Sequence, residues 1–348
     1  MAGGKRSRFF GGSIDESQGV EWSRPVPNFW LMSDDERKKK RRLLVFGALG
    51  VGIGLGVTLA LVRHPLKLAN WYARHRLSRA GLRQYFLEGP QGVFSVFKRA
   101  EDHPPSEETV VLIHGLGGHA GNWFYTVRAL DDYDVAVPDL PGHGDCRLEQ
   151  LEWTPDELFE LFVAEIDAIT DDRPLIMVGN SLGGWLSILY ALHYPQRVRR
   201  LILVNSAGLR FDYPTRLLLP RTRRDARQII GAVFGDEAPR VPGFMLDALI
   251  REANCSPIAR ALEYSGEPPY VGDRLADIEV PTEIIWGTED TLIPHSHAYE
   301  LQKKLRNSRL YLMPGLGHSP QVADARRFNR LLRHILDEPR RLADHPPS

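Results

Sequence analysis

The sequence predicts an α/β protein with a doubly wound, mainly parallel sheet. Short apolar runs alternate along the chain with longer amphipathic stretches, a pattern typical of strand–helix–strand units. The runs that predict buried strands are Thr109–Ile113, Val135–Pro138, Leu175–Val178, Leu201–Val204, Glu283–Trp286 and Leu310–Met313. The stretches that predict helices are Gly121–Leu130, Asp156–Ile169, Leu182–Tyr194, Ser296–Leu305 and Asp324–Leu336. In the stretch 156–169 the apolar residues keep to one broad face, as in a helix packed on a sheet.

Two other segments complete the predicted domain. Tyr85–Glu88 and Val93–Lys98 flank a Gly-Pro-Gln-Gly turn and predict a β-hairpin. Between residues 208 and 277 the alternation stops, and scattered prolines, arginines and short apolar pieces predict a helical cap inserted over one end of the sheet. We therefore expect a core made of residues 83–207 and 278–337, a cap at 208–277 and a tail at 338–348.

Composition narrows the class of function. The 348 residues are 43% hydrophobic, which is enough for a sizeable core. Lysine and arginine balance aspartate and glutamate at 44 each, so the net charge favours no nucleic-acid partner. Cys146 and Cys255 are too few for a disulfide framework and lack metal-ligand spacing, and the sequence leaves their pairing open.

The N-terminal region predicts attachment to a membrane. Residues 1–42 are rich in glycine, serine and charge, predict a disordered tail and end in a basic run. Residues 43–62 contain no charged side chain, and twenty helical residues span about 30 Å, the thickness of a bilayer core. Residues 63–82 add Trp71 and Tyr72 among cations and predict an interfacial linker. We expect a single-pass membrane protein, and because cations flank both ends of the span, its orientation stays open.

The strongest local signal for chemistry is Gly-Asn-Ser-Leu-Gly at residues 179–183. It follows a predicted strand and opens a predicted helix, which is the context that a Gly-x-Ser-x-Gly nucleophile elbow requires. The turn must push the serine hydroxyl out of the sheet, so its flanking side chains have to be minimal. Ser181 is therefore the predicted nucleophile.

A serine hydroxyl needs a base that takes its proton and a carboxylate that orients that base. His318 lies just past the last predicted strand, and Asp290 closes the preceding one. The chain order Ser, Asp, His is the one expected of this architecture. Glu289 is the competing carboxylate. The sequence thus predicts a triad of Ser181, Asp290 and His318.

The tetrahedral intermediate of acyl transfer also needs donors for its oxyanion. One is the backbone N–H of Leu182, directly after the nucleophile. The second is expected in the loop 114–118 after the strand Thr109–Ile113, with Leu116 as the donor and His114 bracing the loop. Serine acyl transfer needs no metal and no organic cofactor, and none is predicted.

Several spaced motifs together resemble the α/β-hydrolase superfamily over residues 83–337. They are Leu-Ile-His-Gly at 112–115, Pro-Asp-Leu-Pro-Gly-His-Gly at 138–144, the elbow at Ser181, Gly-Thr-Glu-Asp at 287–290 and Gly-His at 317–318. Within the superfamily, the N-terminal anchor and the segments 205–209 and 280–287 look most like membrane-anchored monoacylglycerol lipase-type hydrolases and related bacterial lipases. Asn180 before the nucleophile also looks like hydrolases that cleave carbon–carbon bonds in aromatic-ring degradation.

The resemblance implies a serine hydrolase of carboxylic esters, with lipid-like acyl esters such as monoacylglycerols as the expected substrates. The alternative is a cap-gated hydrolase of soluble small molecules, including the carbon–carbon cleaving type. A non-enzymatic receptor or scaffold is the third class, and an intact triad argues against it. Acyl chain length, protein partners and oligomeric state carry no signal in the sequence.

Overall fold

The computed structural model describes Asp35, Lys39 and residues 65–89, 91–100, 106–148, 154–210, 214–255 and 270–338. The chain divides into two compact units, residues 1–58 and 59–348. The first unit contains only Asp35 and Lys39 among the described residues, so the fold below is that of the second unit. The predicted tails at 1–42 and 338–348 lie almost entirely outside the described residues.

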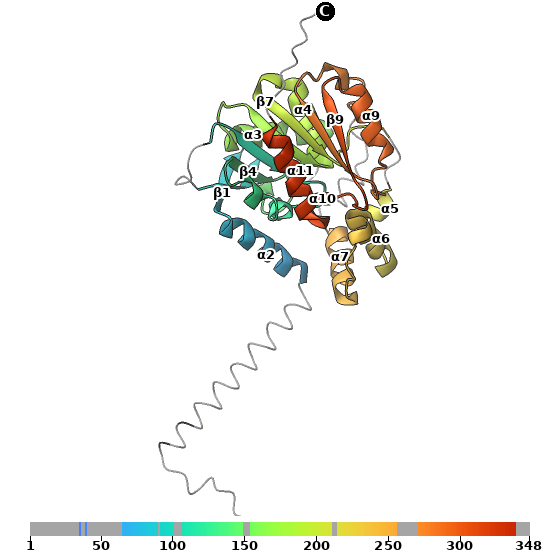
Figure 1. The fold of residues 1–348 in the computed structure, drawn as a ribbon. Coiled ribbons are helices and arrows are strands. Elements are labelled where there is room, and N and C mark those ends of the chain that lie inside the picture. The colour runs from blue at the N-terminus through green and yellow to red at the C-terminus, as the bar shows by residue number, and fades with distance from the viewer. Residues whose placement is uncertain are drawn as a thin grey trace, which may run out of the picture. The chain divides into compact units, whose positions relative to one another are not determined.

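A nine-stranded, mainly parallel sheet forms the centre of this unit, as the sequence predicts (Figure 1). Strands β4, β3, β6, β7, β8 and β9 lie side by side in that order and run parallel. Strands β1 and β2 form an antiparallel hairpin at the β4 edge, and the short β5 pairs with β2. The strand bounds are β1 Leu82–Gly89, β2 Gly92–Arg99, β3 Thr109–Ile113, β4 Asp134–Asp139, β5 Arg147–Leu148, β6 Leu175–Asn180, β7 Val198–Val204, β8 Thr282–Gly287 and β9 Ser308–Met313.

Helices cover both faces of the sheet, because alternate residues of each buried strand point to opposite sides. In β6, Leu175 and Met177 pack in one hydrophobic cluster, and Ile176 and Val178 pack in the other. The first cluster includes residues of α3 (Pro155–Ile169), α4 (Leu182–His193) and α9 (Ser296–Lys304). The second includes residues of α2 (Pro65–Arg79), α11 (Ala325–Asp337) and the 3₁₀-helices η1 (Ala120–Trp123) and η2 (Val127–Leu130).

The structure differs from the predicted helix Gly121–Leu130, which is divided between η1 and η2. Neighbouring side chains accept the first N–H groups of η1: Asp139 accepts from Ala120 at 2.7 Å, and His119 accepts from Gly121 at 3.0 Å. The backbone then makes bonds between residues three apart, as from Thr126 N–H to the Trp123 carbonyl. This tighter winding is usual in short connecting pieces.

The segment predicted as the cap lies between β7 and β8 and contains helices at one end of the sheet (Figure 1). These are α5 (Thr215–Leu218), α6 (Arg223–Phe234) and α7 (Gly243–Cys255), with the 3₁₀-helix η4 (Gly235–Glu237) after α6. Thr222 and Asp225 form a capping box at the start of α6. Arg223 pairs with Asp247 of α7 through two hydrogen bonds of 2.7 and 2.6 Å. The remaining short elements are η3 (Pro195–Arg197), η5 (Leu275–Asp277) and α10 (Pro320–Ala323).

The predicted single-pass membrane location is corrected by the structure. Within the described residues no helix is long and apolar enough to cross a membrane, and the span predicted at 43–62 lies outside them. The longest described helices, α2 and α3, have 15 residues each, a rise of only about 22 Å. Helix α2 occupies most of the predicted interfacial linker and buries Ala73 and Leu77 against the rest of the domain, while Trp71 stays exposed.

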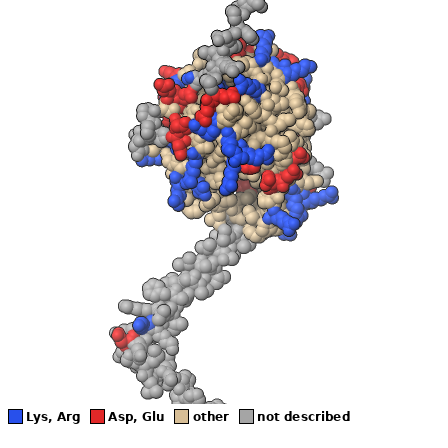
Figure 2. Space-filling model, viewed as in Figure 1, with Lys and Arg blue, Asp and Glu red and all other residues tan. Residues whose placement is uncertain are grey.

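Both signs of charge are intermixed on the face seen in Figure 2. Charges in the described residues are often paired, as Arg333 with Asp132 and Arg173 with Asp134. Cys146 is a free thiol, and the Cys255 side chain lies outside the description.

Helix α3 buries a carboxyl group in the core. Glu165 is fully buried, and neither of its carboxyl oxygens has a hydrogen-bond partner in the described structure. Burial, and then the charge of Asp139, raise the pKa of Glu165 well above its ordinary value. The folded state therefore holds this group protonated at pH values where the unfolded chain ionises it.

Glu165→Gln is expected to become more stabilising, relative to the native chain, as the pH rises. Because the folded-state pKa is raised, the native chain keeps its full free energy of unfolding below about pH 4.5. Above that pH its free energy of unfolding falls by up to about 1.4 kcal/mol per pH unit. A glutamine side chain does not ionise, so the variant does not undergo this loss. Urea unfolding at pH 5, 6 and 7 measures the difference. Glu160→Gln, an exposed change on the same helix, should give a flat difference. A flat difference for Glu165→Gln as well would contradict the raised pKa.

Candidate active site

Ser181 lies in a strained turn between β6 and α4. Its φ of 55° and ψ of −115° are rare for a residue with a side chain. The two flanking glycines allow this turn because backbone crowds them. A Cβ added at Gly179 would lie 2.4 Å from the Gly183 carbonyl oxygen, and one at Gly183 would lie 2.6 Å from the carbonyl oxygen of Ile113. The predicted elbow is therefore a tight turn in which only glycine fits two residues before and two residues after the serine.

Asp290 and His318 meet at the ends of the neighbouring parallel strands β8 and β9. His318 Nδ1 lies 2.7 Å from Asp290 Oδ2. The other oxygen of Asp290 accepts the N–H groups of Leu292 at 2.8 Å and Ile293 at 2.9 Å. Because Nδ1 donates to the carboxylate, Nε2 of the neutral ring is the nitrogen left to accept a proton.

Two asparagines hold the Asp290–His318 pair in place. The sequence alone did not predict a positioning role for either of them. Asn205, at φ 44°, donates its amide to Asp290 Oδ2 at 2.7 Å, and its amide oxygen accepts the N–H of Gly287 at 3.2 Å. Asn180 donates to the carbonyls of Val204 at 3.0 Å and His318 at 3.1 Å. Gln321 donates to the Asn180 amide oxygen at 3.1 Å. Asn180 thereby ties the residue before Ser181 to the main chain of His318.

The structure joins Asp290 and His318 by a hydrogen bond but does not join Ser181 to either of them. Within the described residues, the Ser181 hydroxyl makes no hydrogen bond to the imidazole. Such bonds are often long in proteins without substrate and shorten in the reacting complex. Glu289, the competing carboxylate, is exposed and accepts a hydrogen bond from the Thr288 hydroxyl at 3.1 Å. Its carboxylate makes no hydrogen bond or ion pair with His318 in the described structure.

The loop after β3 lies against the nucleophile. A turn closes from Gly118 N–H to the Gly115 carbonyl at 3.0 Å and places Leu116 at its tip. A Cβ added at Gly115 would lie 2.9 Å from Ser181 Cβ. The N–H groups of Leu116 and Leu182 make no hydrogen bond within the described residues, and the first N–H groups of a helix such as α4 lack partners in that helix.

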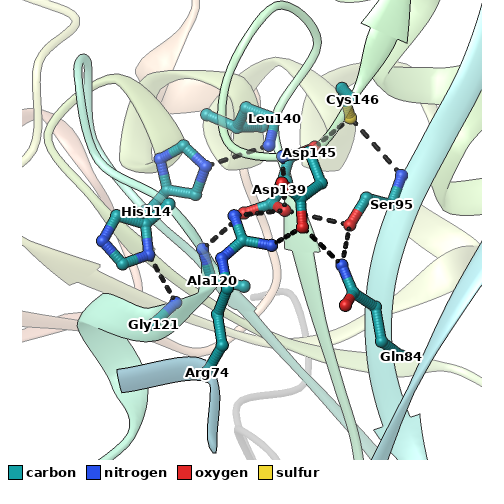
Figure 3. Close-up of polar contacts among 11 residues, drawn as sticks. Arg74, Gln84, Ser95, His114, Ala120, Gly121, Asp139, Leu140, Asp145 and Cys146 are labelled. Atoms are coloured by element: carbon teal, nitrogen blue, oxygen red, sulfur yellow. Dashed lines mark hydrogen bonds and ion pairs between the residues drawn. The ribbon is translucent and has the colours of Figure 1, made fainter. Parts of the chain in front are cut away.

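His114 braces this loop. Its Nε2 accepts the N–H of Leu140 at 2.9 Å (Figure 3), and its Nδ1 lies 2.8 Å from the Gly115 carbonyl oxygen. Burial, followed by the nearby His143, lowers the pKa of His114 well below its usual range. The ring is therefore neutral, which is the form that accepts from Leu140 and donates to Gly115.

The loop 314–319 between β9 and α10 contains His318 and is called the histidine loop here. The insertion between β7 and β8 holds this loop through backbone hydrogen bonds. His318 N–H donates to the Ala232 carbonyl at 2.9 Å, and Ser319 N–H donates to the Val233 carbonyl at 3.0 Å, both at the end of α6. Gly235, at φ 66°, packs so closely that an added Cβ would lie 2.7 Å from Gly317 N. The position of His318 therefore depends on α6 as well as on β9.

No group of three or more His, Cys, Asp or Glu side chains in the described part of the chain is arranged to hold a metal ion.

Comparison with known proteins places the chain in a family. The model of the alpha/beta hydrolase family matches residues 110–331, more than half of the chain. The chain belongs to the alpha/beta hydrolase family. The predicted resemblance is thereby confirmed, and the relatives include esterases and lipases, so the chain is a serine hydrolase enzyme, as predicted.

The matched relatives differ in activity. A monoacylglycerol lipase of Bos taurus is 25% identical and aligns with 77% of this chain and 85% of its own length. A 2-hydroxy-6-oxononadienedioate/2-hydroxy-6-oxononatrienedioate hydrolase of Escherichia coli is 27% identical, over 67% of this chain and 88% of its own. An acetyltransferase component of the acetoin cleaving system of Cupriavidus necator is 31% identical over 66% of this chain, and the chain spans only 63% of that relative's length.

A solved structure described as a membrane phospholipase A, a bacterial virulence factor, has the same fold. It superposes with a TM-score of 0.69 at 24% identity and covers 85% of this chain and 98% of its own.

Gly235→Ala is expected to lower kcat on a short soluble ester by about 10- to 100-fold with little change in KM. The added methyl meets the backbone of the histidine loop at a positive φ, and small displacements of a reacting group have effects of this size. Steady-state kinetics, with circular dichroism to confirm folding, measure it.

Gly231→Ala is the matched control. An added Cβ there meets nothing within 4 Å, so kcat should stay unchanged and the helix should gain about 0.5–1 kcal/mol. Equal kcat values for the two variants would show that α6 does not position His318.

Proposed function

We propose that the chain hydrolyses carboxylic esters through an acyl-enzyme on Ser181, with His318 as the general base and Asp290 as its orienting carboxylate. The observation that carries the proposal is the Asp290–His318 hydrogen bond of 2.7 Å beside the strained turn at Ser181. A hydrogen-bonded carboxylate and imidazole next to a half-buried serine turn are the parts that activate a hydroxyl nucleophile.

The reaction follows from these positions. Ser181 Oγ attacks the ester carbonyl carbon while His318 Nε2 takes the hydroxyl proton, and Asp290 stabilises the imidazolium that forms. The N–H groups of Leu116 and Leu182 stabilise the oxyanion. The intermediate then expels the alcohol, which takes the proton from His318. Water, deprotonated by His318, attacks the acyl-enzyme and releases the acid and Ser181. This sequence of steps uses no metal and no organic cofactor.

We propose lipid-like acyl esters such as monoacylglycerols as the substrates and residues 208–277 as the cap over the site. The similarity to a monoacylglycerol lipase supports the substrate class. The helices α5, α6 and α7 at the end of the sheet, with α6 hydrogen-bonded to the His318 loop, support the cap.

The second candidate is a carbon–carbon bond hydrolase of soluble ring-cleavage products. It is favoured by the similarity to the 2-hydroxy-6-oxononadienedioate hydrolase. Asn180, the residue that suggested it in the sequence, is buried, and its amide bonds to the Val204 and His318 carbonyls and to Gln321. Asn180 therefore braces the site and does not discriminate between the two candidates.

Asp290→Asn is expected to lower kcat by up to about 10⁴-fold, because an amide cannot stabilise the imidazolium or hold its tautomer. Turnover of a short ester measures it, and labelling by a fluorophosphonate should fall in parallel and disappear in Ser181→Ala. The matched control is Glu289→Gln, one residue earlier and exposed, which should keep nearly full activity. A larger loss in Glu289→Gln than in Asp290→Asn would reassign the carboxylate.

Monoacylglycerols are expected to give a kcat/KM at least tenfold above that of a 2-hydroxy-6-oxo-dienoate. A pocket that accepts acyl chains gains about 0.8 kcal/mol for each buried methylene group, so kcat/KM should rise along a series of esters of graded chain length. Parallel assays of the purified full chain on both substrate classes measure this ratio. Preference for the dienoate would select the carbon–carbon hydrolase instead.

A further inference from the structure

Helix α2 lies before the residues that the family model matches and contributes one cation to a buried polar cluster (Figure 3). Arg74 of α2 is mostly buried, and its guanidinium lies 3.2 Å from Asp139 Oδ2 and also pairs with Asp145. Gln84 of β1 donates to Asp145 at 2.9 Å. One face of α2 is therefore fixed to the loop that follows β4.

Asp139 is the centre of this cluster, and its side chain is fully buried. Its Oδ2 accepts from the Ser95 hydroxyl at 2.9 Å and from the Asp145 N–H at 3.0 Å. Its Oδ1 accepts from the Ala120 N–H at 2.7 Å. Among the contacts described for Asp139, Arg74 supplies the positive charge, and a buried carboxylate without a cation is costly.

The residues 139 and 140 hold the loop 114–120 at both ends. The Asp139 carboxylate binds the Ala120 N–H at the end of the loop, and the Leu140 N–H binds His114 at its beginning. Between these two points lies Leu116, whose N–H is the proposed oxyanion donor. Helix α2 also packs on η1, where a Cβ added at Gly121 would lie 2.8 Å from Ala73 Cβ. The loop is thus fixed to α2 through a charge and through packing.

We infer that Arg74 is a positioning residue for the oxyanion side of the active site, acting through Asp139 on the loop 114–120. The inference rests on the proposed function, since it assigns Leu116 the oxyanion role. Without Arg74, Asp139 and Asp145 lose their shared cation, the loop after β4 shifts, and the Leu116 N–H leaves its position beside Ser181. Helix α2 is then a part of the catalytic domain rather than a linker leading to it.

The test uses the full chain with Arg74→Met, which keeps the aliphatic stem and removes the charge. We expect kcat on a short soluble ester to fall about 10- to 100-fold, KM to change less than about twofold, and the inhibition constant of a trifluoromethyl ketone to rise by the same factor as kcat falls. That ketone forms a tetrahedral adduct whose oxyanion uses the same donors. Hydrogen exchange of the peptide 113–123 should be faster.

Arg79→Met is the matched control, because Arg79 is an exposed cation on the same helix. In Arg79→Met, kcat, KM, the inhibition constant of the ketone and the exchange rate of the peptide 113–123 should all stay as in the native chain. Arg74→Lys keeps the positive charge but cannot bind both carboxylates through two separate N–H groups of a guanidinium, so kcat should fall by an intermediate factor. This variant replaces Arg74→Met in the test if Arg74→Met does not fold.

Two outcomes would overturn the inference. One is a lower melting temperature with unchanged kcat and unchanged ketone affinity, which would make Arg74 a purely stabilising residue. The other is unchanged exchange of the peptide 113–123. If the native chain hydrolyses no ester, the proposed function fails, and the exchange measurement still decides whether Arg74 holds the loop.

Discussion

The backbone turn at Ser181 is the constraint on which the rest of the site depends. A residue with a side chain at φ 55° costs free energy, so the surrounding structure has to hold it there. The Ser181 N–H donates to the Val204 carbonyl, and the Ser181 carbonyl accepts from Gly184, Trp185 and Ala207. The turn is thus fixed by the neighbouring strand β7 and by the helix α4 that it begins. Its glycines allow the backbone of the β3 loop to approach closely.

Two buried carboxylates organise the loops on either side of this turn. Asp290 accepts two backbone N–H groups, the Asn205 amide and the His318 ring. Asp139 accepts two backbone N–H groups, the Ser95 hydroxyl and the Arg74 guanidinium. A buried carboxylate is tolerated where it is hydrogen-bonded in this way, and each contact then fixes one segment. One carboxylate fixes the histidine loop, and the other fixes the predicted oxyanion loop.

Regular elements could be predicted where one local pattern decides them. The six predicted strands appear at the predicted places, and in five of them the apolar run is covered on both faces of the sheet, whereas β9 is a partly exposed edge strand. The stretch 121–130 has a helical pattern, yet it is divided between two 3₁₀-helices, η1 and η2, and the Asp139 carboxylate accepts the first N–H group of η1. Asp139 lies in β4, so no local sequence pattern contains this contact. The helix α2 was predicted as part of a linker because its contact with Asp139 joins residues 65 positions apart.

The sequence by itself determined the family, the class of enzyme and the residues proposed for the chemistry. Ser181, Asp290 and His318 stand in short motifs at strand ends, and the order of strands and helices brings such ends to one edge of a parallel sheet. Only the tertiary structure decided which groups hold them. Asn205, Asn180 and the end of α6 act through hydrogen bonds between segments far apart in the chain, as Arg74 does on Asp139. The reason is physical: a motif fixes local backbone geometry, whereas the partner of a buried polar group is whichever donor or acceptor the packing brings within about 3 Å.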